Sequence, residues 1–181
     1  MKQIKMFGLG GQGVVTAAKV FCEAVAIYEN AYAQAIPAYG HERRGAPVYT
    51  DAMISLNPIK LKGFVYAPDY VVIFDVSVLD RGIDVMAGAS RETVFIVNTP
   101  DLKTSYPFFS HKAFWVDAQS IALEALKVDI PNTAMLGALA GARLVGIKAI
   151  RSAISDKFKA AAPSNLNAAQ AAFDSIVSNE K

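Results

Sequence analysis

The stretch that decides the fold is "FGLGGQGVVTAA", residues 7–18. Gly8, Gly10 and Gly13 fit the pattern G-x-G-x-x-G, which begins at the end of an apolar run at 4–9 and continues directly after it. A glycine-rich turn that leads from a buried strand into a helix suits phosphate binding, because the helix N-terminus offers free N–H groups and partial positive charge. The alternatives are that the glycines only permit a tight turn and that the amide between them caps the helix. Four residues of this turn are candidate ligand-binding residues: Gly10, Gly11, Gln12 and Gly13.

Strand and helix patterns alternate along much of the chain. Apolar runs typical of buried parallel strands occupy 4–9, 70–75, 93–98 and 113–118. Helical spacing predicts a long helix over 12–29 and a shorter one over 77–88. We therefore predict an α/β fold. In full, it is one three-layer α/β/α domain over 1–181, Rossmann-like, with helices on both faces of a mostly parallel, mixed sheet in which 4–9, 70–75 and 93–98 are adjacent.

The segment between the first helix and residue 66 has a different pattern. "YAQAI" (32–36) is predicted to be the second strand, and "PVYTDAMIS" (47–55) alternates like a strand with one exposed face. Asn57-Pro58 indicates a turn, and "IKLKGFVY" (59–66) is predicted to return as a short antiparallel strand. The C-terminal part, 118–180, is predicted to be mostly helical, and its breaks are expected near three residues: Pro131, Gly146 and Pro163.

A dinucleotide-binding fold needs one further feature, an acidic residue about 20 positions after the glycines, where it binds the ribose. The predicted second strand ends at Pro37 and carries no acid. The sequence therefore weakens the NAD-binding interpretation of the glycine turn.

Composition excludes several classes of protein. The 181 residues are 53% hydrophobic and 19% charged, which excludes disorder and favours a surface partly covered by a partner. The net charge of +2 and the lack of basic runs give no indication of nucleic-acid binding. One cysteine, Cys22, excludes a disulfide framework and falls on the apolar face of the first helix, so we expect an inert core thiol. The most apolar stretch, 134–147, is too short to span a membrane and contains Arg143, and no secretory signal is evident, so we expect a cytoplasmic protein without a membrane partner.

The loop "PAYGHERRGAPV" (37–48) concentrates charge between two glycines. Adjacent arginines suit carboxylate or phosphate, because each guanidinium offers a planar fork of donors. The alternative is a solvated loop with local ion pairs. We take Arg43 and Arg44 as candidate ligand-binding residues, and the loop also supplies candidate interface residues: Tyr39, His41, Glu42 and Arg43.

Three further residues are candidates by position. Asn98 ends a predicted strand at the carboxyl edge of the sheet, where α/β proteins bind ligands, although a turn residue there is equally expected. Tyr106 and Phe108 belong to "YPFF" (106–109), which suits either an interface patch or the core. No residue is assigned a catalytic or metal-binding role, and Asp75 lacks the partner that catalysis would need.

Four blocks together carry a family resemblance: "GLGGQGVVTAAKV" (8–20), "PAYGHERRGAPV" (37–48), "APDYVVIFDVSVL" (67–79) and "PNTAMLGALAG" (131–141). In this order they resemble the gamma subunit of the 2-oxoacid:ferredoxin oxidoreductases, and the form "RRGAPV" is most like the pyruvate enzyme. His41 departs from the proline expected in many relatives, which affects the expected shape of the loop.

The resemblance implies a subunit of a complex that decarboxylates a 2-oxoacid to acyl-CoA and reduces ferredoxin. Thiamine diphosphate, Mg and 4Fe–4S clusters would be held by other subunits, and the isolated chain would be inactive. This chain would dock on the alpha, beta and delta subunits, meet ferredoxin only through the complex, and help to bind coenzyme A. The glycine turn and the arginine pair suit the phosphates of coenzyme A, but the same arginines could instead bind carboxylates on the catalytic subunits, and the sequence does not separate these two uses. The competing hypotheses are a free-standing Rossmann-type nucleotide-binding oxidoreductase and a non-catalytic scaffold domain.

Overall fold

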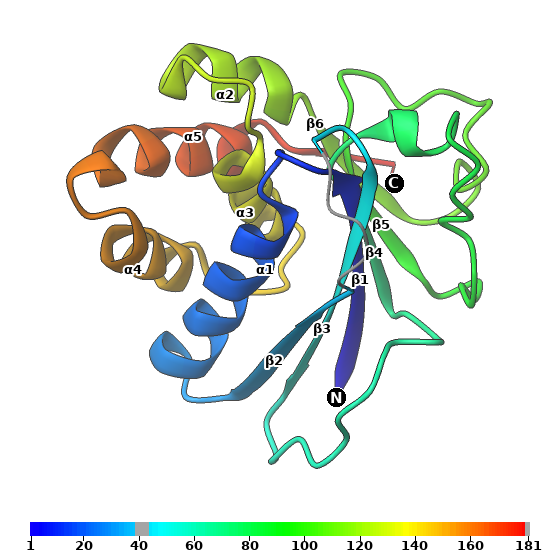
Figure 1. Cartoon of the computed structure of the whole chain (residues 1–181), viewed down its shortest axis with the longest axis horizontal. Helices are drawn as coiled ribbons and strands as arrows, with labels where there is room; N and C mark the ends of the chain where they lie inside the picture. Colours follow the sequence, from blue (N-terminus) through cyan, green and yellow to red (C-terminus); the bar gives the residue numbers. More distant parts are fainter. Residues whose placement is uncertain (39–43, 180–181) are drawn as a thin grey trace.

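A mixed sheet organises the chain, as the computed structural model shows for residues 1–38 and 44–179 (Figure 1). Its strands, in chain order, are β1 (Lys2–Leu9), β2 (Tyr32–Pro37), β3 (Pro47–Ser55), β4 (Tyr70–Ile73), β5 (Val94–Asn98), β6 (Ala113–Val116) and β7 (Val177–Ser178). Their spatial order is β2-β3-β1-β4-β5-β6-β7. β1, β4, β5 and β6 run parallel, whereas β3 is antiparallel to β1 and β2, and β7 is antiparallel to β6. The predicted adjacency of the first three apolar strands is confirmed.

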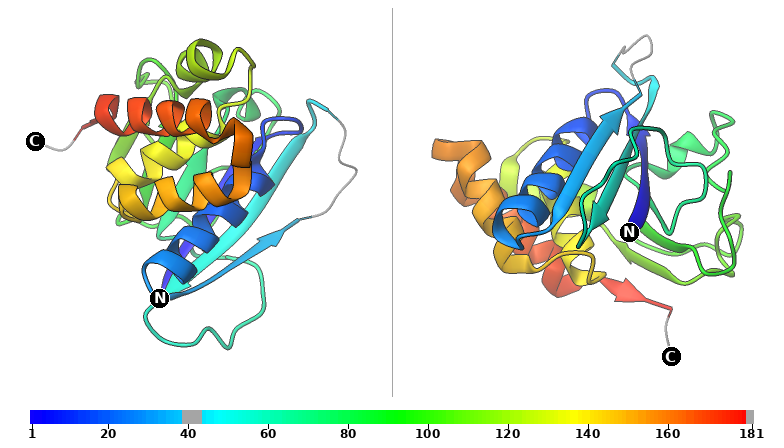
Figure 2. Two further views of the ribbon diagram at one scale, coloured as in Figure 1. Left: turned by 90° about the vertical axis from the view of Figure 1, so that its left-hand side faces the viewer. Right: turned by 90° about the horizontal axis from the view of Figure 1, so that it is seen from below.

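The α-helices pack on one face of the sheet, as both views of Figure 2 show. They are α1 (Val14–Glu23), α2 (Ala118–Leu126), α3 (Asn132–Gly141), α4 (Ile147–Phe158) and α5 (Ala162–Ser175). The predicted first helix is continued by a π-helical turn, η1 (Ala24–Tyr28), and a 3-10 turn, η3 (Lys159–Ala161), joins α4 to α5. Because side chains alternate along a strand, Ile4, Met6 and Ile96 face these helices in the larger core.

The opposite face of the sheet is also buried, but not by α-helices. Phe7, Val71, Ile73, Phe95 and Val97 form a second core there, which a 3-10 turn, η2 (Val76–Val78), and irregular loops cover. The α/β class and the mixed sheet are thus confirmed. The prediction of helices on both faces is wrong, because loops take the place of one helical layer.

The helix predicted over 77–88 is absent. Only η2 is helical in this segment, and turns follow it. The Asp75 carboxylate accepts the Ser77 N–H at 2.9 Å and so caps a turn that does not continue. Gly82 then takes a left-handed conformation (φ +73°), which ends helical geometry.

The strand predicted over 59–66 is also absent. Its backbone groups bind side chains of the sheet instead of a strand ladder. The Val65 N–H donates to the Asp51 carboxylate at 2.7 Å, and the Val65 carbonyl accepts from Lys5 Nζ at 2.8 Å. The segment is therefore irregular and is bound to β1 and β3 through Val65.

The C-terminal helices follow their predicted breaks. Pro131 and Gly146 are the N-caps of α3 and α4, and Pro163 lies in the first turn of α5. α3 is buried on nearly all sides, and a Cβ added at Gly137 would lie 1.9 Å from the Ala169 carbonyl oxygen. Gly137 therefore allows α3 and α5 to approach closely. Within residues 1–38 and 44–179, no helix combines the length and the apolar character needed to cross a membrane.

Candidate functional site

The glycine turn connects β1 to α1 at the carboxyl end of β1. Gly13 is the N-cap of α1, adopts φ +75°, and accepts the Ala17 N–H through its carbonyl at 2.8 Å. A Cβ at this position would lie 2.7 Å from Nδ2 of Asn132, so α3 packs directly against the turn. The N–H groups of the first turn of α1 have no acceptors within the helix. The turn therefore has the donor geometry that its sequence predicts.

Gln12 holds the turn to the sheet. Its Oε1 accepts the Leu9 N–H at 2.8 Å, and its Nε2 donates to Asp75 Oδ2 at 2.6 Å. The other Asp75 oxygen accepts the Ser77 N–H, so this carboxylate is held by two donors at the end of β4. The Gln12 amide thus joins the ends of β1 and β4, a role that neither the helix-capping interpretation nor the ligand interpretation anticipated.

The end of the charged loop joins the glycine turn directly. The Gly10 N–H donates to the Ala46 carbonyl at 2.8 Å, and the Gly45 N–H donates to the Gly10 carbonyl at 2.9 Å. Arg44 is exposed, and its Cγ lies 3.6 Å from the position that a Cβ on Gly11 would occupy. Two stretches that are more than 30 residues apart in the sequence therefore form one surface.

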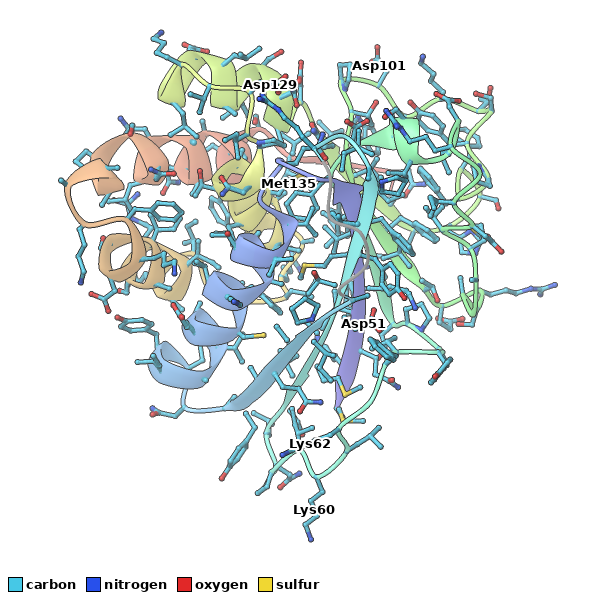
Figure 3. The ribbon with its side chains drawn as sticks, in the orientation of Figure 1. Asp51, Lys60, Lys62, Asp101, Asp129 and Met135 are labelled. Carbon is cyan, nitrogen blue, oxygen red and sulfur yellow. The ribbon has the colours of Figure 1, made fainter. Side chains whose placement is uncertain are left out.

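An open groove of about 1050 Å³ follows this surface. The glycine turn and the first turn of α1 line it, together with Arg44, Asp75 and the segment 128–130 between α2 and α3. The guanidinium of Arg44 and the carboxylates of Asp75 and Asp129 are the charged groups among its described lining residues; Figure 3 labels Asp129 at the junction of α2 and α3. The groove thus combines one cationic side, a helix N-terminus and two acids.

The structure brings together five of the candidate ligand-binding residues: Gly10, Gly11, Gln12, Gly13 and Arg44. Four loop candidates lie outside the described residues: Tyr39, His41, Glu42 and Arg43. Sequence reasoning missed the contribution of 128–130 to the groove. The one sequence signal for residues 128–130 is that they directly precede Pro131, which begins one of the four sequence blocks.

Asn98 has a structural role and does not line the groove. Its Nδ2 donates to the Phe74 carbonyl at 2.8 Å, and its Oδ1 accepts the Gln119 N–H at 3.2 Å. The residue is buried, and its amide connects the ends of β4 and β5 with the first turn of α2. These bonds account for an asparagine at the carboxyl edge without a ligand.

The two aromatic candidates for an interface belong to the second core. Phe108 is 0% exposed and stacks on Phe95 with ring centroids 4.9 Å apart, and Tyr106 stacks on Phe108 at 5.3 Å. The interface prediction for Phe108 is therefore wrong, because the loop folds its ring under the sheet. Tyr106 is partly buried against the same core.

Cys22 is buried in the larger core, as predicted. Burial raises the pKa of its thiol to about 12, and the nearby charge of Glu23 adds to this shift. The thiol is therefore protonated at neutral pH and is a poor nucleophile. Over the described ranges, no group of three or more His, Cys, Asp and Glu side chains is arranged to hold a metal ion.

Comparison with known proteins gives the family of this fold and turn. The model of the family described as pyruvate ferredoxin/flavodoxin oxidoreductase matches residues 3–175. The pyruvate/ketoisovalerate oxidoreductases common subunit gamma of Pyrococcus furiosus is 44% identical over 180 residues, which cover 96% of each chain. The pyruvate synthase subunit PorC of Methanocaldococcus jannaschii is 39% identical over 181 residues, 98% of each chain.

A solved structure agrees with these sequence matches. The crystal structure of pyruvate oxidoreductase subunit PORC from Thermotoga maritima superposes with a TM-score of 0.83 at 31% identity, covering 99% of this chain and 98% of that one. The resemblance indicated by the four sequence blocks is confirmed. The chain belongs to the pyruvate ferredoxin/flavodoxin oxidoreductase family, and it matches gamma and PorC subunits over nearly its whole length.

Proposed function

We propose that this gamma-type chain docks on the catalytic subunits of a 2-oxoacid:ferredoxin oxidoreductase, with pyruvate as the favoured 2-oxoacid, and contributes a binding groove for coenzyme A. The observation that carries the proposal is the meeting of Arg44 and the N-terminus of α1 on one groove at the carboxyl end of β1. Backbone N–H groups at a helix start and a guanidinium fork are the donors that phosphate groups prefer. Coenzyme A offers a pyrophosphate and a 3′-phosphate to such donors.

The positions of the two acids in the groove indicate which end of the ligand lies beside Arg44. Asp75 is held by Gln12 and by the Ser77 N–H, so its charge is partly offset within the fold. Asp129 is exposed and disfavours phosphate on its own side of the groove. The Arg44 side is therefore the side for the anionic end of the ligand, and the less charged part of the ligand extends toward 128–130.

The name of one relative supports coenzyme A over the 2-oxoacid as the ligand. The P. furiosus protein is named as a subunit common to pyruvate and ketoisovalerate oxidoreductases. A subunit shared by enzymes for two different 2-oxoacids serves a step that does not depend on the substrate side chain. Coenzyme A binding is such a step, because the same thiol accepts the acyl group whichever 2-oxoacid is used.

The sheet order argues against the free-standing NAD-binding alternative. In a dinucleotide fold the strand that carries the ribose-binding acid is parallel to the first strand and comes next in the chain. Here β3 lies beside β1 and runs antiparallel to it, and β2 lies one position further out and ends at Pro37. β2 carries no acid, and the one acid of β3, Asp51, is buried and bound to Val65 and Lys5, so neither strand offers a free carboxylate for a ribose.

In this proposal the chain's own residues bind and orient coenzyme A. Thiamine diphosphate, Mg and iron–sulfur clusters on other subunits supply the bond-breaking and electron-transfer chemistry, and electrons reach ferredoxin through the complex. Gln12 acts as a positioning residue, because it fixes the turn that presents the α1 N–H groups. Arg44 acts as the direct ligand contact.

The test is steady-state kinetics of the reconstituted complex carrying Arg44→Gln. The matched control is Arg81→Gln, which changes an exposed arginine in the turns that follow η2. Loss of a charge-assisted hydrogen bond costs about 1.5–3 kcal/mol, so the KM for coenzyme A should rise about 10- to 150-fold. The KM for pyruvate should stay unchanged, as should both constants of the control. An unchanged KM for coenzyme A in the Arg44 variant would overturn the assignment of this groove.

A further inference from the structure

The segment 56–66, "LNPIKLKGFVY", exposes an unusual set of side chains; we call it the arm. Leu56 is 86% exposed, Leu61 54%, Phe64 44% and Tyr66 80%. The arm extends beyond the end of the sheet at which β1 begins, so it lies at the opposite end of β1 from the glycine turn (Figure 1). Four large apolar side chains exposed within eleven residues are a feature that marks interaction sites.

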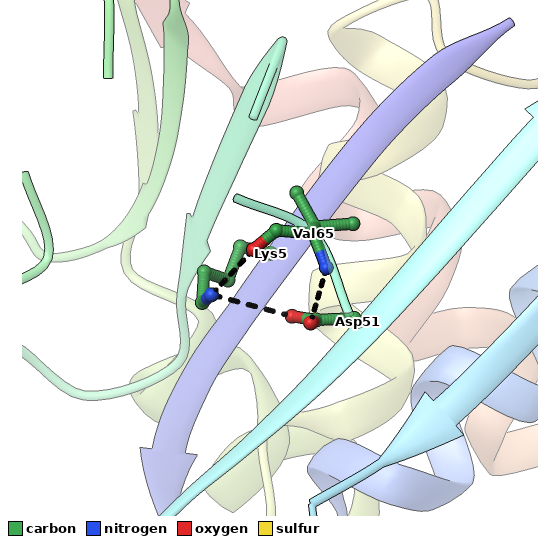
Figure 4. A network of polar contacts seen from close by, with 3 residues as sticks. All are labelled: Lys5, Asp51 and Val65. Carbon is green, nitrogen blue, oxygen red and sulfur yellow. Dashed lines mark hydrogen bonds and ion pairs between the residues drawn. The ribbon is translucent and has the colours of Figure 1, made fainter. Parts of the chain in front are cut away.

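The backbone of the arm is anchored although its side chains are exposed. Val65 is fully buried, its N–H donates to Asp51 at 2.7 Å, and its carbonyl accepts from Lys5 at 2.8 Å. Lys5 Nζ also lies 3.8 Å from Asp51 Oδ1, which completes the network shown in Figure 4. One buried residue thus ties the arm to both β1 and β3.

Two further contacts hold the arm on either side of Val65. Gln34 Nε2 donates to the Leu61 carbonyl at 2.8 Å, which fixes the arm to β2. The Tyr66 carbonyl oxygen packs so closely on Gly88 that an added Cβ there would lie 1.8 Å away. Exposed apolar side chains are therefore presented by a backbone that is already ordered, which lowers the entropic cost of binding a partner.

The charge of the arm indicates the chemistry of its partner. Lys60 and Lys62 are exposed, and Figure 3 shows Lys60 at the outer tip. The segment 55–66 contains no acidic residue. An apolar surface with two ammonium groups is complementary to an apolar surface edged by carboxylates, because such pairing steers association and excludes partners of like charge.

We propose that the arm is a docking element that seats this chain on another subunit of its oxidoreductase complex, at an apolar surface of that subunit edged by acidic side chains. The proposal rests on the proposed function only in taking the chain to act within such a complex. It names a surface that the groove does not include, so the two can fail separately. Leu61 and Phe64 are the central contacts, because Leu61 is anchored through its carbonyl and lies between the two lysines in the sequence, and Phe64 directly precedes the anchored Val65.

The first test measures the affinity of this chain for the remaining subunits, using Leu61→Ser/Phe64→Ser in the arm and Leu123→Ser, an exposed leucine of α2, as control. Truncation of central apolar contacts typically weakens an interface strongly, so the Kd should rise at least 30-fold for the arm variant and less than threefold for the control. A thermal melt of each isolated variant checks that these exposed substitutions leave the fold intact. Equal affinities of parent and arm variant would overturn the proposal.

The second test addresses charge and ordering. Lys60→Glu/Lys62→Glu should slow association and reverse its salt dependence, whereas Lys148→Glu/Lys157→Glu, the same charge change on α4, should not. Hydrogen exchange of the parent complex should show protection of 56–66 relative to the free chain. Absent protection would overturn the docking role, and so would a homodimer of the isolated chain that the arm variants dissociate, since that result makes the arm a contact between copies. The coenzyme A kinetics of the Arg44 variant report on the proposed function independently.

Discussion

Replacing Gly13 by alanine tests whether the turn requires glycine for its left-handed backbone conformation, for its close contact with α3, or for both. Gly13 adopts φ +75°, a region in which a non-glycine residue costs about 1–2 kcal/mol. The added Cβ would also lie 2.7 Å from Asn132 Nδ2 and 3.0 Å from Asn132 Cβ, closer than van der Waals contact allows. Overpacking of this kind adds about 1–3 kcal/mol. We expect Gly13→Ala to lower the free energy of unfolding by about 2–5 kcal/mol.

Gly82 provides a control with nearly the same backbone and no steric term. It adopts φ +73°, and no atom of the described residues lies within 4 Å of its added Cβ. Gly82→Ala should therefore cost only the conformational term, about 1–2 kcal/mol. The difference between the two variants isolates the contact of the turn with α3.

Urea denaturation of the isolated chain, followed by circular dichroism, measures both values. A double mutant, Gly13→Ala/Asn132→Ala, should recover part of the steric loss because it removes the amide that the new methyl group meets, although Cβ of residue 132 remains. Equal losses for the alanine variants of Gly13 and Gly82 would refute the reasoning, since the turn would then depend on backbone conformation alone.

Four other predictions concern two packing contacts, the titration of one buried acid and the activity of the isolated chain. Gly137→Ala should lower the free energy of unfolding by more than about 3 kcal/mol in urea denaturation, because its methyl group would overlap the Ala169 carbonyl and push α3 away from α5. A loss below about 1 kcal/mol would contradict the close contact. Phe108→Ala should cost about 3–5 kcal/mol as a core truncation, whereas a stable variant with weakened subunit binding would restore the interface interpretation. Burial raises the pKa of Asp51 above its ordinary value of 3.8, against the opposing effects of the Val65 hydrogen bond and Lys5. The folded chain therefore holds this proton at a pH where the unfolded chain has released it, so the contribution of Asp51 to the free energy of unfolding should fall as pH rises from 3.8 through the raised pKa. Asp51→Asn lacks this contribution, and plots of the free energy of unfolding against pH that run parallel for the two proteins would contradict the shift. The isolated chain should show no turnover with pyruvate, thiamine diphosphate, coenzyme A and an artificial electron acceptor, and any turnover without partner subunits would contradict the proposal that other subunits carry the reaction.

Much of the fold was predictable because it rests on local signals. Buried parallel strands such as 70–75 are continuous apolar runs, and the breaks at Pro131 and Gly146 come from residues that start or interrupt helices. The two failed elements depended on distant partners. The backbone of Val65 bonds to the side chains of Asp51 and Lys5 instead of to a neighbouring strand, and the Asp75 carboxylate caps a short turn where a helix was predicted. Hydrophobic periodicity does not reveal either of these hydrogen-bonding arrangements.

The candidate site divides in the same way. The glycine turn and Arg44 were predictable from residue type and spacing, whereas the part played by 128–130 depends on how α2 and α3 meet the turn. Asn98 and Phe108 show the limit of positional arguments, because a carboxyl-edge amide and an aromatic loop residue serve the chain's own packing equally well. Sequence alone does not decide between a polar group that awaits a ligand and one that is satisfied inside the fold.

The position of β1 between the arm and the groove has a mechanical consequence. Its eight residues span about 26 Å at about 3.3 Å per residue, and β3 pairs with it along its full length. If the chain were bound through the arm, the groove would lie at the other end of this rigid pair of strands. A tilt of about 5° at the seat would then displace the groove by about 2 Å over that length. Because misplacement of about 1 Å can cost a reaction about 100-fold in rate, a docked arm would have to fit its partner closely for the groove to hold its ligand in the reacting position.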